Sequence, residues 1–312
     1  MDFDPTACVD LHIHSTASDG TLTPPEILEL AHGLKLGAIA ITDHDTLDGS
    51  RQAIAAGIPE GLGFLTGVEI SAERPRFFPG KGSCHILGYR LDLENRALNQ
   101  TLEKLQSARK NRNPLILERL QKIGFDLSME EIEQAAGPKG QIGRPHFAQV
   151  MLNKGYVPTF NAAFDSYLAT GKPAYVDKQR VDFPRAIALI REAGGIPVLA
   201  HPVLLGTPGG RLEDSMIHSL KEMGMLGIEA YYSEHTTAQR EHYLKLASRH
   251  GLLVTGGSDF HGEFKPQTKL GSGKGNLRVP IDLFSTLQTW SSGSGQSQLA
   301  MPCVMGSISE LK

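Results

Sequence analysis

Seven short apolar runs, mostly rich in branched residues, recur along this chain, and helical segments separate most of them. Such alternation predicts a mostly parallel sheet, open or closed into a barrel, and 312 residues suffice for one large α/β barrel. Thr23 and Glu26 form a predicted capping box at the start of the first helix, and Gly37 is expected to end that helix. Strands are expected at Cys8–His14, Ala38–Thr42, Phe64–Ile70, Cys84–Tyr89, Ile196–Ala200, Gly227–Tyr231 and Leu252–Thr255.

The alternation stops between about residues 93 and 182, where the pattern predicts helices only. Asn113-Pro114 is expected to kink the first of them. We therefore predict a barrel formed by residues 1–93 and 182–290, an inserted helical cap or substrate domain at 94–181, and a loosely ordered tail at 291–312, which is rich in Ser, Gly and Gln. The expected helices are Leu98–Ile123, Ser128–Ala136, Arg144–Asn153 and Thr159–Thr170.

The composition excludes several classes of protein. No run of eighteen or more apolar residues is present, and the N-terminal MDFDPTACVD lacks the pattern of a secretory signal, so we expect no membrane partner. Cys8, Cys84 and Cys303 have no paired spacing, which favours a reduced, cytoplasmic location. The sequence gives no expectation for the oligomeric state.

The net charge of −3 conceals a basic middle segment. Residues 101–180 hold twelve Lys or Arg against eight Asp or Glu, whereas the remainder of the chain is acidic. Such a distribution suits a small anionic substrate better than a long nucleic-acid duplex. Charge also varies along chains without any functional reason, and this balance alone does not separate the two interpretations.

Side chains that commonly bind metals stand at the ends of nearly all predicted strands, where ligands gather in α/β sheets. His12 and His14 are two apart on one strand, so both are expected on the same face. A single histidine there is more often a core residue than a ligand, but burying nine ionisable groups together would be costly unless cations offset them. We therefore predict two or three divalent ions, with Mn²⁺ favoured and Fe²⁺ or Zn²⁺ as alternatives. The candidates are His12, His14, Asp19, His44, Glu69, His85, His201, Asp259 and His261.

The other histidines are expected to be solvated, because they fall on helices or loops among polar residues. They are His32, His218, His235, His242 and His250.

Four motifs, DLHIHSTASDG, ITDHDT, AHP and SDFH, together with Glu69 in GVEIS and His85 in HILGY, resemble the polymerase and histidinol phosphatase (PHP) family. The resemblance extends from Val9 to about Leu270 and matches both order and spacing. It implies a distorted (β/α)₇ barrel with an inserted helical domain. It also implies that all nine candidates are metal ligands, that Glu69 bridges two ions, and that Asp43 and Asp45 orient His44 or the neighbouring backbone.

Within that family, the insertion and the stretch GRPHFA resemble a branch of 3′,5′-nucleoside bisphosphate phosphatases, some of which also trim short RNA oligonucleotides from the 5′ end. Arg144 and His146 match the substrate-phosphate contacts of that branch. Arg109 and Arg112 lie three apart on one expected helix face and are further candidates, with an ordinary solvated helix face as the alternative.

The expected reaction is metal-dependent phosphoester hydrolysis, by in-line attack of a hydroxide held between two ions, so no protein side chain is assigned as the nucleophile. The predicted substrate is the 3′-phosphate of a nucleoside 3′,5′-bisphosphate. The alternatives are 5′–3′ exoribonuclease activity on short RNA, a phosphatase resembling histidinol phosphatase, and a non-catalytic metal-binding domain.

Overall fold

The computed structural model describes residues 4–80, 82–137 and 141–291. One sheet contains seven strands in the order of the sequence, from β1 to β7. The strands are β1 (Val9–Ile13), β2 (Ala38–Ile41), β3 (Gly63–Ser71), β4 (His85–Tyr89), β5 (Ile196–Leu199), β6 (Gly227–Tyr232) and β7 (Leu253–Gly257). All seven predicted strands are therefore present, and no strand end differs from its predicted position by more than two residues.

The two edges of the sheet meet, so the sheet forms a nearly closed barrel. Just after β7, the N–H of Asp259 donates to the carbonyl of His12 at 2.9 Å, and the N–H of His14 donates to the carbonyl of Phe260 at 2.9 Å. These bonds join the last strand to the first. The predicted distorted (β/α)₇ barrel is confirmed.

Strand β4 runs against its neighbours. It pairs antiparallel with β3 and with β5, whereas the other neighbouring strands pair parallel. His85 is the first residue of β4 and not the last, so the expected position of the candidates at the carboxyl ends of strands does not hold for His85. Because β4 is reversed, its beginning lies at the edge where the parallel strands end.

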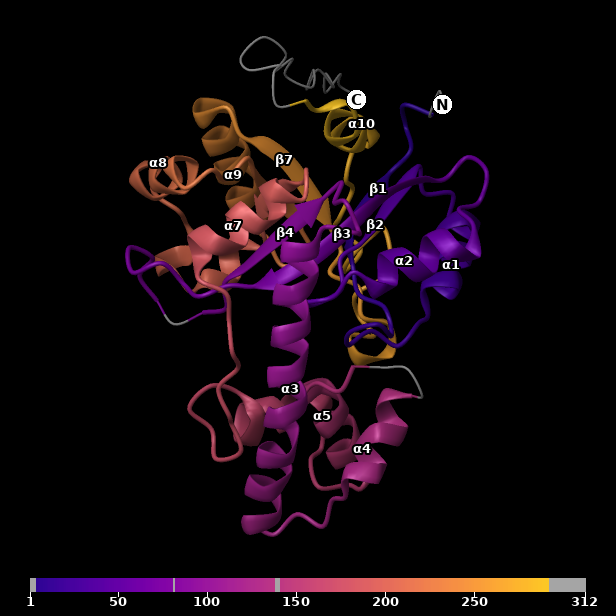
Figure 1. Ribbon diagram of the computed structural model, residues 1–312, viewed down its shortest axis with the longest axis vertical. Coiled ribbons are helices and arrows are strands. Elements are labelled where there is room, and N and C mark those ends of the chain that lie inside the picture. The colour runs from indigo at the N-terminus through magenta and orange to yellow at the C-terminus, as the bar shows by residue number, and fades with distance from the viewer. Residues whose placement is uncertain (1–3, 81, 138–140, 292–312) are drawn as a thin grey trace, which may run out of the picture.

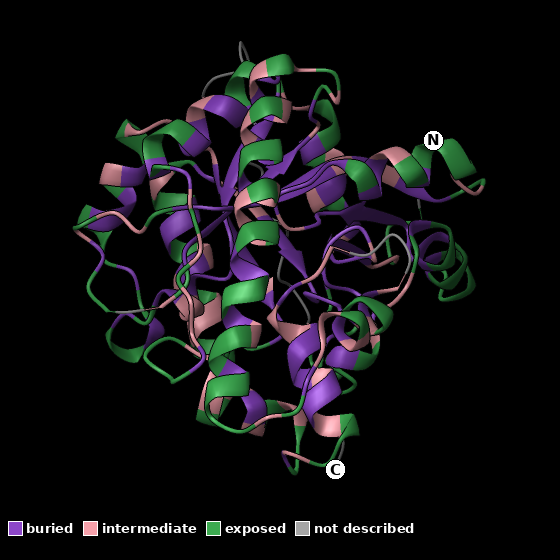
Figure 2. Cartoon of the chain, turned by 60° about the horizontal axis from the view of Figure 1, so that its bottom comes forward, coloured by how far each residue is buried: buried purple, intermediate pink, exposed green. Residues whose placement is uncertain are grey.

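Five helices surround the barrel with their outer faces exposed, and a sixth, α10, covers the end of the barrel away from α3, while the strands between them are buried (Figures 1 and 2). The predicted capping box of Thr23 and Glu26 begins α1, which ends at Gly33, before the predicted Gly37. None of the helices in the described residues is long and apolar enough to cross a membrane. The six helices are α1 (Pro24–Gly33), α2 (Asp48–Ala56), α7 (Phe183–Glu192), α8 (Asp214–Glu222), α9 (Thr237–His250) and α10 (Ile281–Thr289).

The segment between β4 and α7 is mainly helical, as predicted. Its elements are α3 (Arg96–Lys122), α4 (Met129–Ala136), α5 (Arg144–Asn153), α6 (Phe160–Ala163) and a π-helical turn at Phe164–Leu168. The long helix α3 leaves the barrel and leads to α4 and α5 (Figure 1), and Pro114 lies inside it without ending it. The division into domains stays a prediction, and residues 292–312 of the predicted tail lie outside the described residues.

Two apolar cores hold α3 in place. Near its start, Leu98 and Leu102 pack into the cluster that contains Ile86 and Ile187 of the barrel. Farther along, Ile116 belongs to a second cluster, which is built from the helical segment and includes Phe147. Because α3 buries side chains in the barrel core near its start and in the second cluster farther along, it connects the barrel rigidly to the helices beyond it.

Candidate metal centre

The structure brings all nine predicted metal-binding side chains together at one end of the barrel. Their potential ligand atoms form four overlapping groups, and within each group the atoms lie within 4.8 Å of one another. Eight of the nine side chains are buried, and His44 is partly exposed. The groups are His14, Asp19, His44 and His261; His12, Glu69 and His201; His12, His14 and Asp259; and His44, Glu69 and His85.

Glu69, near the end of β3, is the centre of this cluster. Its Oε1 lies 2.7 Å from His201 Nε2 and 2.8 Å from His85 Nδ1. Its Oε2 lies 2.9 Å from His44 Nδ1 and 3.3 Å from His14 Nε2. One carboxylate thus faces imidazoles that come from four different parts of the barrel.

Two aspartates occupy the other side of the cluster. Asp259 Oδ1 lies 3.2 Å from His14 Nε2, and Asp19 Oδ1 lies 3.6 Å from both His14 Nδ1 and His261 Nε2. The rings of His14 and His261 stack with their centroids 4.1 Å apart. The carboxylates are therefore distributed among the imidazoles and do not lie side by side.

The arrangement of donor atoms fits divalent cations. His12 Nε2 lies 3.2 Å from His14 Nε2, and His85 Nδ1 lies 3.3 Å from His201 Nε2, so pairs of imidazole nitrogens face each other. Asp19 Oδ1 is buried and has no hydrogen-bond partner among the described residues. Imidazole nitrogens mixed with carboxylate oxygens suit Mn²⁺, Fe²⁺ or Zn²⁺, and a cation between them would satisfy these converging lone pairs.

Burial and charge act in opposite directions on the histidines of the cluster. Burial lowers the pKa of His85 to about 3, although Glu69 lies beside it. Burial, followed by the charge of Lys265, lowers the pKa of His261 to about 3. Burial alone would lower the pKa of His14 as well, but hydrogen bonds with Asp259 and Glu69 raise it to about 9.

Glu229 supports two members of the cluster, and sequence reasoning missed it. It is fully buried in the middle of β6. Its Oε1 lies 2.9 Å from His12 Nδ1, and its Oε2 accepts the backbone N–H of His201 at 2.6 Å. A carboxylate in an otherwise apolar strand was the available signal, because such a group is rarely buried without a partner.

The predicted supporting roles of Asp43 and Asp45 differ in detail from what the structure shows. Asp43 accepts hydrogen bonds from the backbone and side chain of Ser15 at 2.7 and 2.6 Å, and from Ser18 at 2.5 Å, so it holds the loop between His14 and Asp19. Asp45 accepts the backbone N–H of Ser71 at 2.8 Å. Both aspartates therefore position backbone that leads to candidate ligands.

Backbone strain is also concentrated here. His201, Asp259 and Asp45 have positive φ angles of 23°, 58° and 55°. Such conformations are costly for residues other than glycine and persist where the surrounding contacts hold them.

Basic side chains from the helical segment lie beside the cluster. Arg109 Nη2 donates to Asp45 Oδ2 at 2.9 Å, and Arg112 is 6% exposed. The alternative of a solvated helix face is therefore wrong for both arginines. Gly143, which precedes α5, lies next to Arg109 and Asp19, since a Cβ added there would be 3.6 Å from Arg109 Nη1 and 3.9 Å from the Asp19 Cβ.

Arg144 and His146 stand at the start of α5. Arg144 Nη1 donates to the carbonyl of Leu168 at 3.0 Å, and its guanidinium lies 5.5 Å from the centre of the Tyr175 ring. His146 is buried, and its Nδ1 accepts the N–H of Gly143 at 2.9 Å. That bond assigns the proton to Nε2, which leaves one N–H donor on the ring.

Two lysines complete the basic groups, and no sequence motif had pointed to either of them. Lys178 Nζ lies 2.8 Å from Ser71 Oγ and 3.1 Å from His85 Nε2. Burial lowers the pKa of Lys178 to about 7, opposed by the charge of Asp45. Lys265 Nζ donates to Asp259 Oδ2 at 2.7 Å. Lys178 reaches the cluster across 93 residues of sequence from His85, so only the fold decides its proximity, whereas Lys265 lies six residues after Asp259.

The histidines outside the cluster differ from the prediction in part. His32 and His218 are exposed, as expected. His242 and His250 are half-buried, with partners at Leu212 and Asp214. His235 is 6% exposed, so its prediction as a solvated residue is wrong. It lies three residues after the end of β6, and its ring packs between those of Tyr232 and Tyr243.

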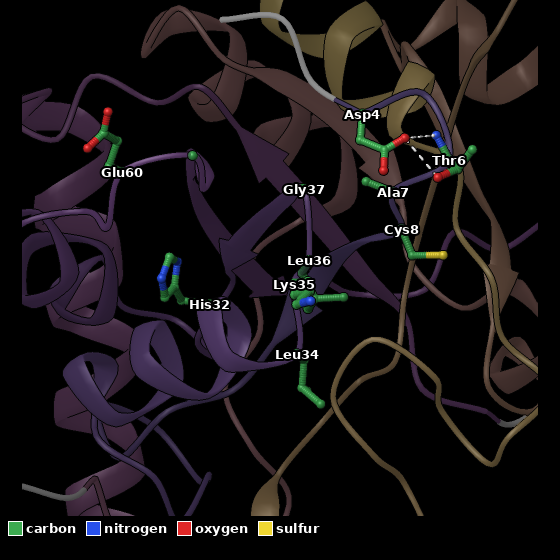
Figure 3. A pocket seen from close by; sticks show the side chains of 11 residues that line it. Asp4, Thr6, Ala7, Cys8, His32, Leu34, Lys35, Leu36, Gly37 and Glu60 are labelled. Carbon is green, nitrogen blue, oxygen red and sulfur yellow. Dashed lines mark hydrogen bonds between the residues drawn. The ribbon is translucent and has the colours of Figure 1, made fainter.

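A cavity of about 750 Å³ lies at the opposite end of the barrel, among residues that precede β1 and β2 (Figure 3). Asp4 is hydrogen-bonded to Thr6 on one side of it, and His32 and Glu60 line another part. It contains none of the nine candidate ligands. This cavity is therefore separate from the metal-capable cluster.

Removal of divalent ions with a chelator is expected to lower the thermal stability of the protein, because the clustered carboxylates and imidazoles lose their bound charge. At a free metal concentration of 100 times Kd, binding would stabilise the fold by about 2.7 kcal/mol, which corresponds to roughly 4 °C in Tm for a chain of 312 residues. Differential scanning calorimetry with and without Mn²⁺ measures the shift. An unchanged Tm, together with no metal retained after dialysis, would contradict a cation site.

Comparison with known proteins gives a consistent result. The PHP domain family matches residues 10–178. The chain is 34% identical over 268 residues to a 3′,5′-nucleoside bisphosphate phosphatase of Chromobacterium violaceum, covering 82% of this chain and 87% of the relative. It is 34% identical over 252 residues to a 5′-3′ exoribonuclease of Haemophilus influenzae, covering 81% and 89%.

A solved structure is also similar to this chain. The crystal structure of a protein from Bifidobacterium adolescentis, described as a metal-dependent phosphoesterase, superposes with a TM-score of 0.80 at 31% identity. The match covers 91% of this chain and 96% of that one.

Proposed function

The chain belongs to the PHP domain family of metal-dependent phosphoesterases, and from this premise we propose that it removes the 3′-phosphate of nucleoside 3′,5′-bisphosphates. Adenosine 3′,5′-bisphosphate would then yield AMP. The relative in Chromobacterium violaceum carries this activity in its name. The arrangement of basic groups beside the metal-capable cluster supports the same substrate class.

The proposal rests on four neighbouring cations, of which Arg112 is buried and Arg109, Arg144 and Lys178 are partly buried. Burial lowers the pKa of Arg112 to about 9, and the neighbouring charges of Arg109 and Arg144 add to the effect. Arg109 and Arg144 also disfavour the charged form of Lys178. Mutual repulsion of this kind is costly in a buried site unless an anion compensates it. A substrate with two phosphates supplies one anion for the metal-capable cluster and a second for these arginines.

The side chains divide into two sets by position. The nine residues around Glu69 would hold two or three divalent ions, with Mn²⁺ as our first choice. Bound ions would activate a water molecule and neutralise charge on the scissile phosphate. Lys178, whose Nζ lies 3.1 Å from His85 Nε2, would bind an oxygen of that same phosphate. The planar guanidinium of Arg144 would bind the second, non-reacting phosphate through two N–H donors. Arg109, Arg112 and His146 would be further contacts to that phosphate.

Hydrolysis of short RNA from its 5′ end is the second candidate, because the Haemophilus influenzae relative is named a 5′-3′ exoribonuclease. A 5′-phosphorylated oligonucleotide offers the same two groups, a terminal phosphate and a phosphoester one nucleotide away. Both activities would use one metal-capable cluster and one set of arginines.

Substrate specificity is tested by product release in the presence of Mn²⁺. Adenosine 3′,5′-bisphosphate, a 5′-phosphorylated trinucleotide and histidinol phosphate are compared at equal concentration. Fast conversion of the bisphosphate to AMP is the expected result. Faster cleavage of the trinucleotide would make RNA the preferred substrate, and activity on histidinol phosphate alone would overturn the proposal.

Arg144→Ala is expected to raise KM for the bisphosphate by about tenfold to a hundredfold, as is typical for loss of a charge-assisted hydrogen bond. The kcat value is expected to change little, since Arg144 is not among the nine residues of the metal-capable cluster. Steady-state kinetics on adenosine 3′,5′-bisphosphate and adenosine 3′-monophosphate separate the two phosphates. Arg185→Ala, at an exposed ion pair with Glu192, is the matched control. An equal increase in KM for both substrates would contradict binding of the second phosphate by Arg144.

A further inference from the structure

Phe264 lies where the barrel meets the helical segment. It ends the short 3₁₀ turn Gly262–Phe264, which directly follows the candidate ligand His261. Its ring is buried and meets the ring of His146 on α5 edge to face, with the centroids 5.2 Å apart and the planes at 83°. It also stacks on the ring of Phe160 on α6, with the centroids 5.7 Å apart. One aromatic side chain of the barrel thus contacts two helices of the segment.

The turn that carries Phe264 is fixed to the loops of the metal-capable cluster. Gly262 has a positive φ of 67°, and a Cβ added there would lie 1.9 Å from Thr21 Oγ1, so the position requires glycine. That same Oγ1 accepts a backbone N–H of the turn at 3.0 Å, and the N–H of Thr21 donates to the carbonyl of His261 at 3.2 Å. Thr21 lies two residues after Asp19. The Phe264 ring is therefore held by the two loops that carry Asp19 and His261.

His146 has one proton available for a ligand. Its Nδ1 accepts the N–H of Gly143, so the proton of the neutral ring is on Nε2. Burial lowers the pKa of His146, opposed by the charge of Asp19, and the ring is neutral at pH 7. No described residue accepts from Nε2, and this atom is not sealed from solvent. The direction of its N–H depends on the orientation of the ring, which the edge-to-face contact with Phe264 restricts.

We propose that Phe264 is a positioning residue for substrate binding, which holds the His146 ring with its Nε2 proton toward the second phosphate. This inference rests on the proposed function, in which His146 contacts that phosphate. A ring that is free to turn loses conformational entropy when the substrate binds. Loss of the aromatic contact therefore weakens binding although every group that touches the substrate is still present. The expected increase in KM is about threefold to tenfold, the range that edge-to-face aromatic pairs contribute.

A double-mutant cycle tests whether Phe264 acts through His146. KM for adenosine 3′,5′-bisphosphate is measured with Mn²⁺ for Phe264→Leu, His146→Ala and the double variant. Phe264→Leu is expected to raise KM about threefold to tenfold. The double variant is expected to have the same KM as His146→Ala, because no imidazole is left to position. Effects of the two changes that multiply would overturn the inference and leave the proposed function intact. An unchanged KM in His146→Ala would overturn both the inference and the contact assigned to His146.

Phe125→Leu is the matched control. Phe125 is half-buried in the same helical segment, where its ring contacts those of Tyr156 and Tyr167, and its replacement should leave KM at the wild-type value. An equal rise in KM for Phe125→Leu would assign the effect to general loosening of the segment and refute the inference. Metal content and circular dichroism are measured for every variant. Loss of metal in Phe264→Leu would place its effect on the His261 loop, against a role in orienting His146.

Histidine-selective ¹⁵N NMR of the zinc-loaded, diamagnetic protein tests the same contact without substrate. The ring nitrogens of His146, assigned by their loss in His146→Ala, are expected to show one neutral form with the proton on Nε2. In Phe264→Leu the ring can turn away from Gly143, so the shifts of its two nitrogens are expected to move toward each other. Wild-type shifts in Phe264→Leu would refute the proposal even if KM rises.

Discussion

Replacing Glu69 with glutamine is expected to remove bound metal and to reduce phosphoesterase activity by more than about a hundredfold. Loss of a residue that merely orients a metal ligand typically costs 10–100-fold, and Glu69 faces four imidazoles within 3.3 Å. The amide has nearly the same shape but no charge, and its NH₂ group cannot accept from a histidine or bind a cation. Metal content by mass spectrometry and kcat/KM for adenosine 3′,5′-bisphosphate measure the effect.

Glu241→Gln is the matched control, because Glu241 is an exposed carboxylate on α9. It should retain full metal content and activity. Circular dichroism of both variants distinguishes loss of metal from loss of fold. Normal metal content in folded Glu69→Gln would show that Glu69 is not a ligand.

Glu229→Gln is expected to cost about 10–100-fold in metal affinity and in kcat/KM. In the wild-type protein, Glu229 Oε2 accepts a hydrogen bond from the His201 N–H, and Glu229 Oε1 accepts one from His12 Nδ1. The amide has only one oxygen, so its NH₂ group must face either the His201 N–H, where two donors repel, or His12, whose proton would have to move to Nε2. Either outcome disturbs a candidate ligand. Competition with a metal chelator of known affinity measures the change.

Glu222→Gln, an exposed carboxylate on α8, serves as the control for Glu229→Gln. The pattern expected is a weaker metal site in a folded protein whose nine candidate ligands are all intact. Wild-type metal affinity for Glu229→Gln would show that the bond to His12 has no part in positioning the ligands.

The local sequence determined the strands, the caps and the identity of the nine clustered side chains. Short apolar runs, mostly rich in branched residues, predicted strands near their observed positions, and Thr23 with Glu26 predicted a helix start that the structure contains. The spacing of His12 and His14 placed both rings on one face, and their Nε2 atoms lie 3.2 Å apart. These features depend on neighbours a few residues away, so the physical cause of each is readable in the chain itself.

Only the tertiary structure decided which distant groups support the cluster. The direction of β4, which gives His85 its place, is set by pairing with β3 and β5 and not by the residues of β4. Burial of Arg112 and His235 likewise depends on which elements pack over them. Glu229 meets His12 across 217 residues of sequence. No local pattern encodes such a contact, because it exists only once the barrel has closed and burial has made each unpaired charge costly.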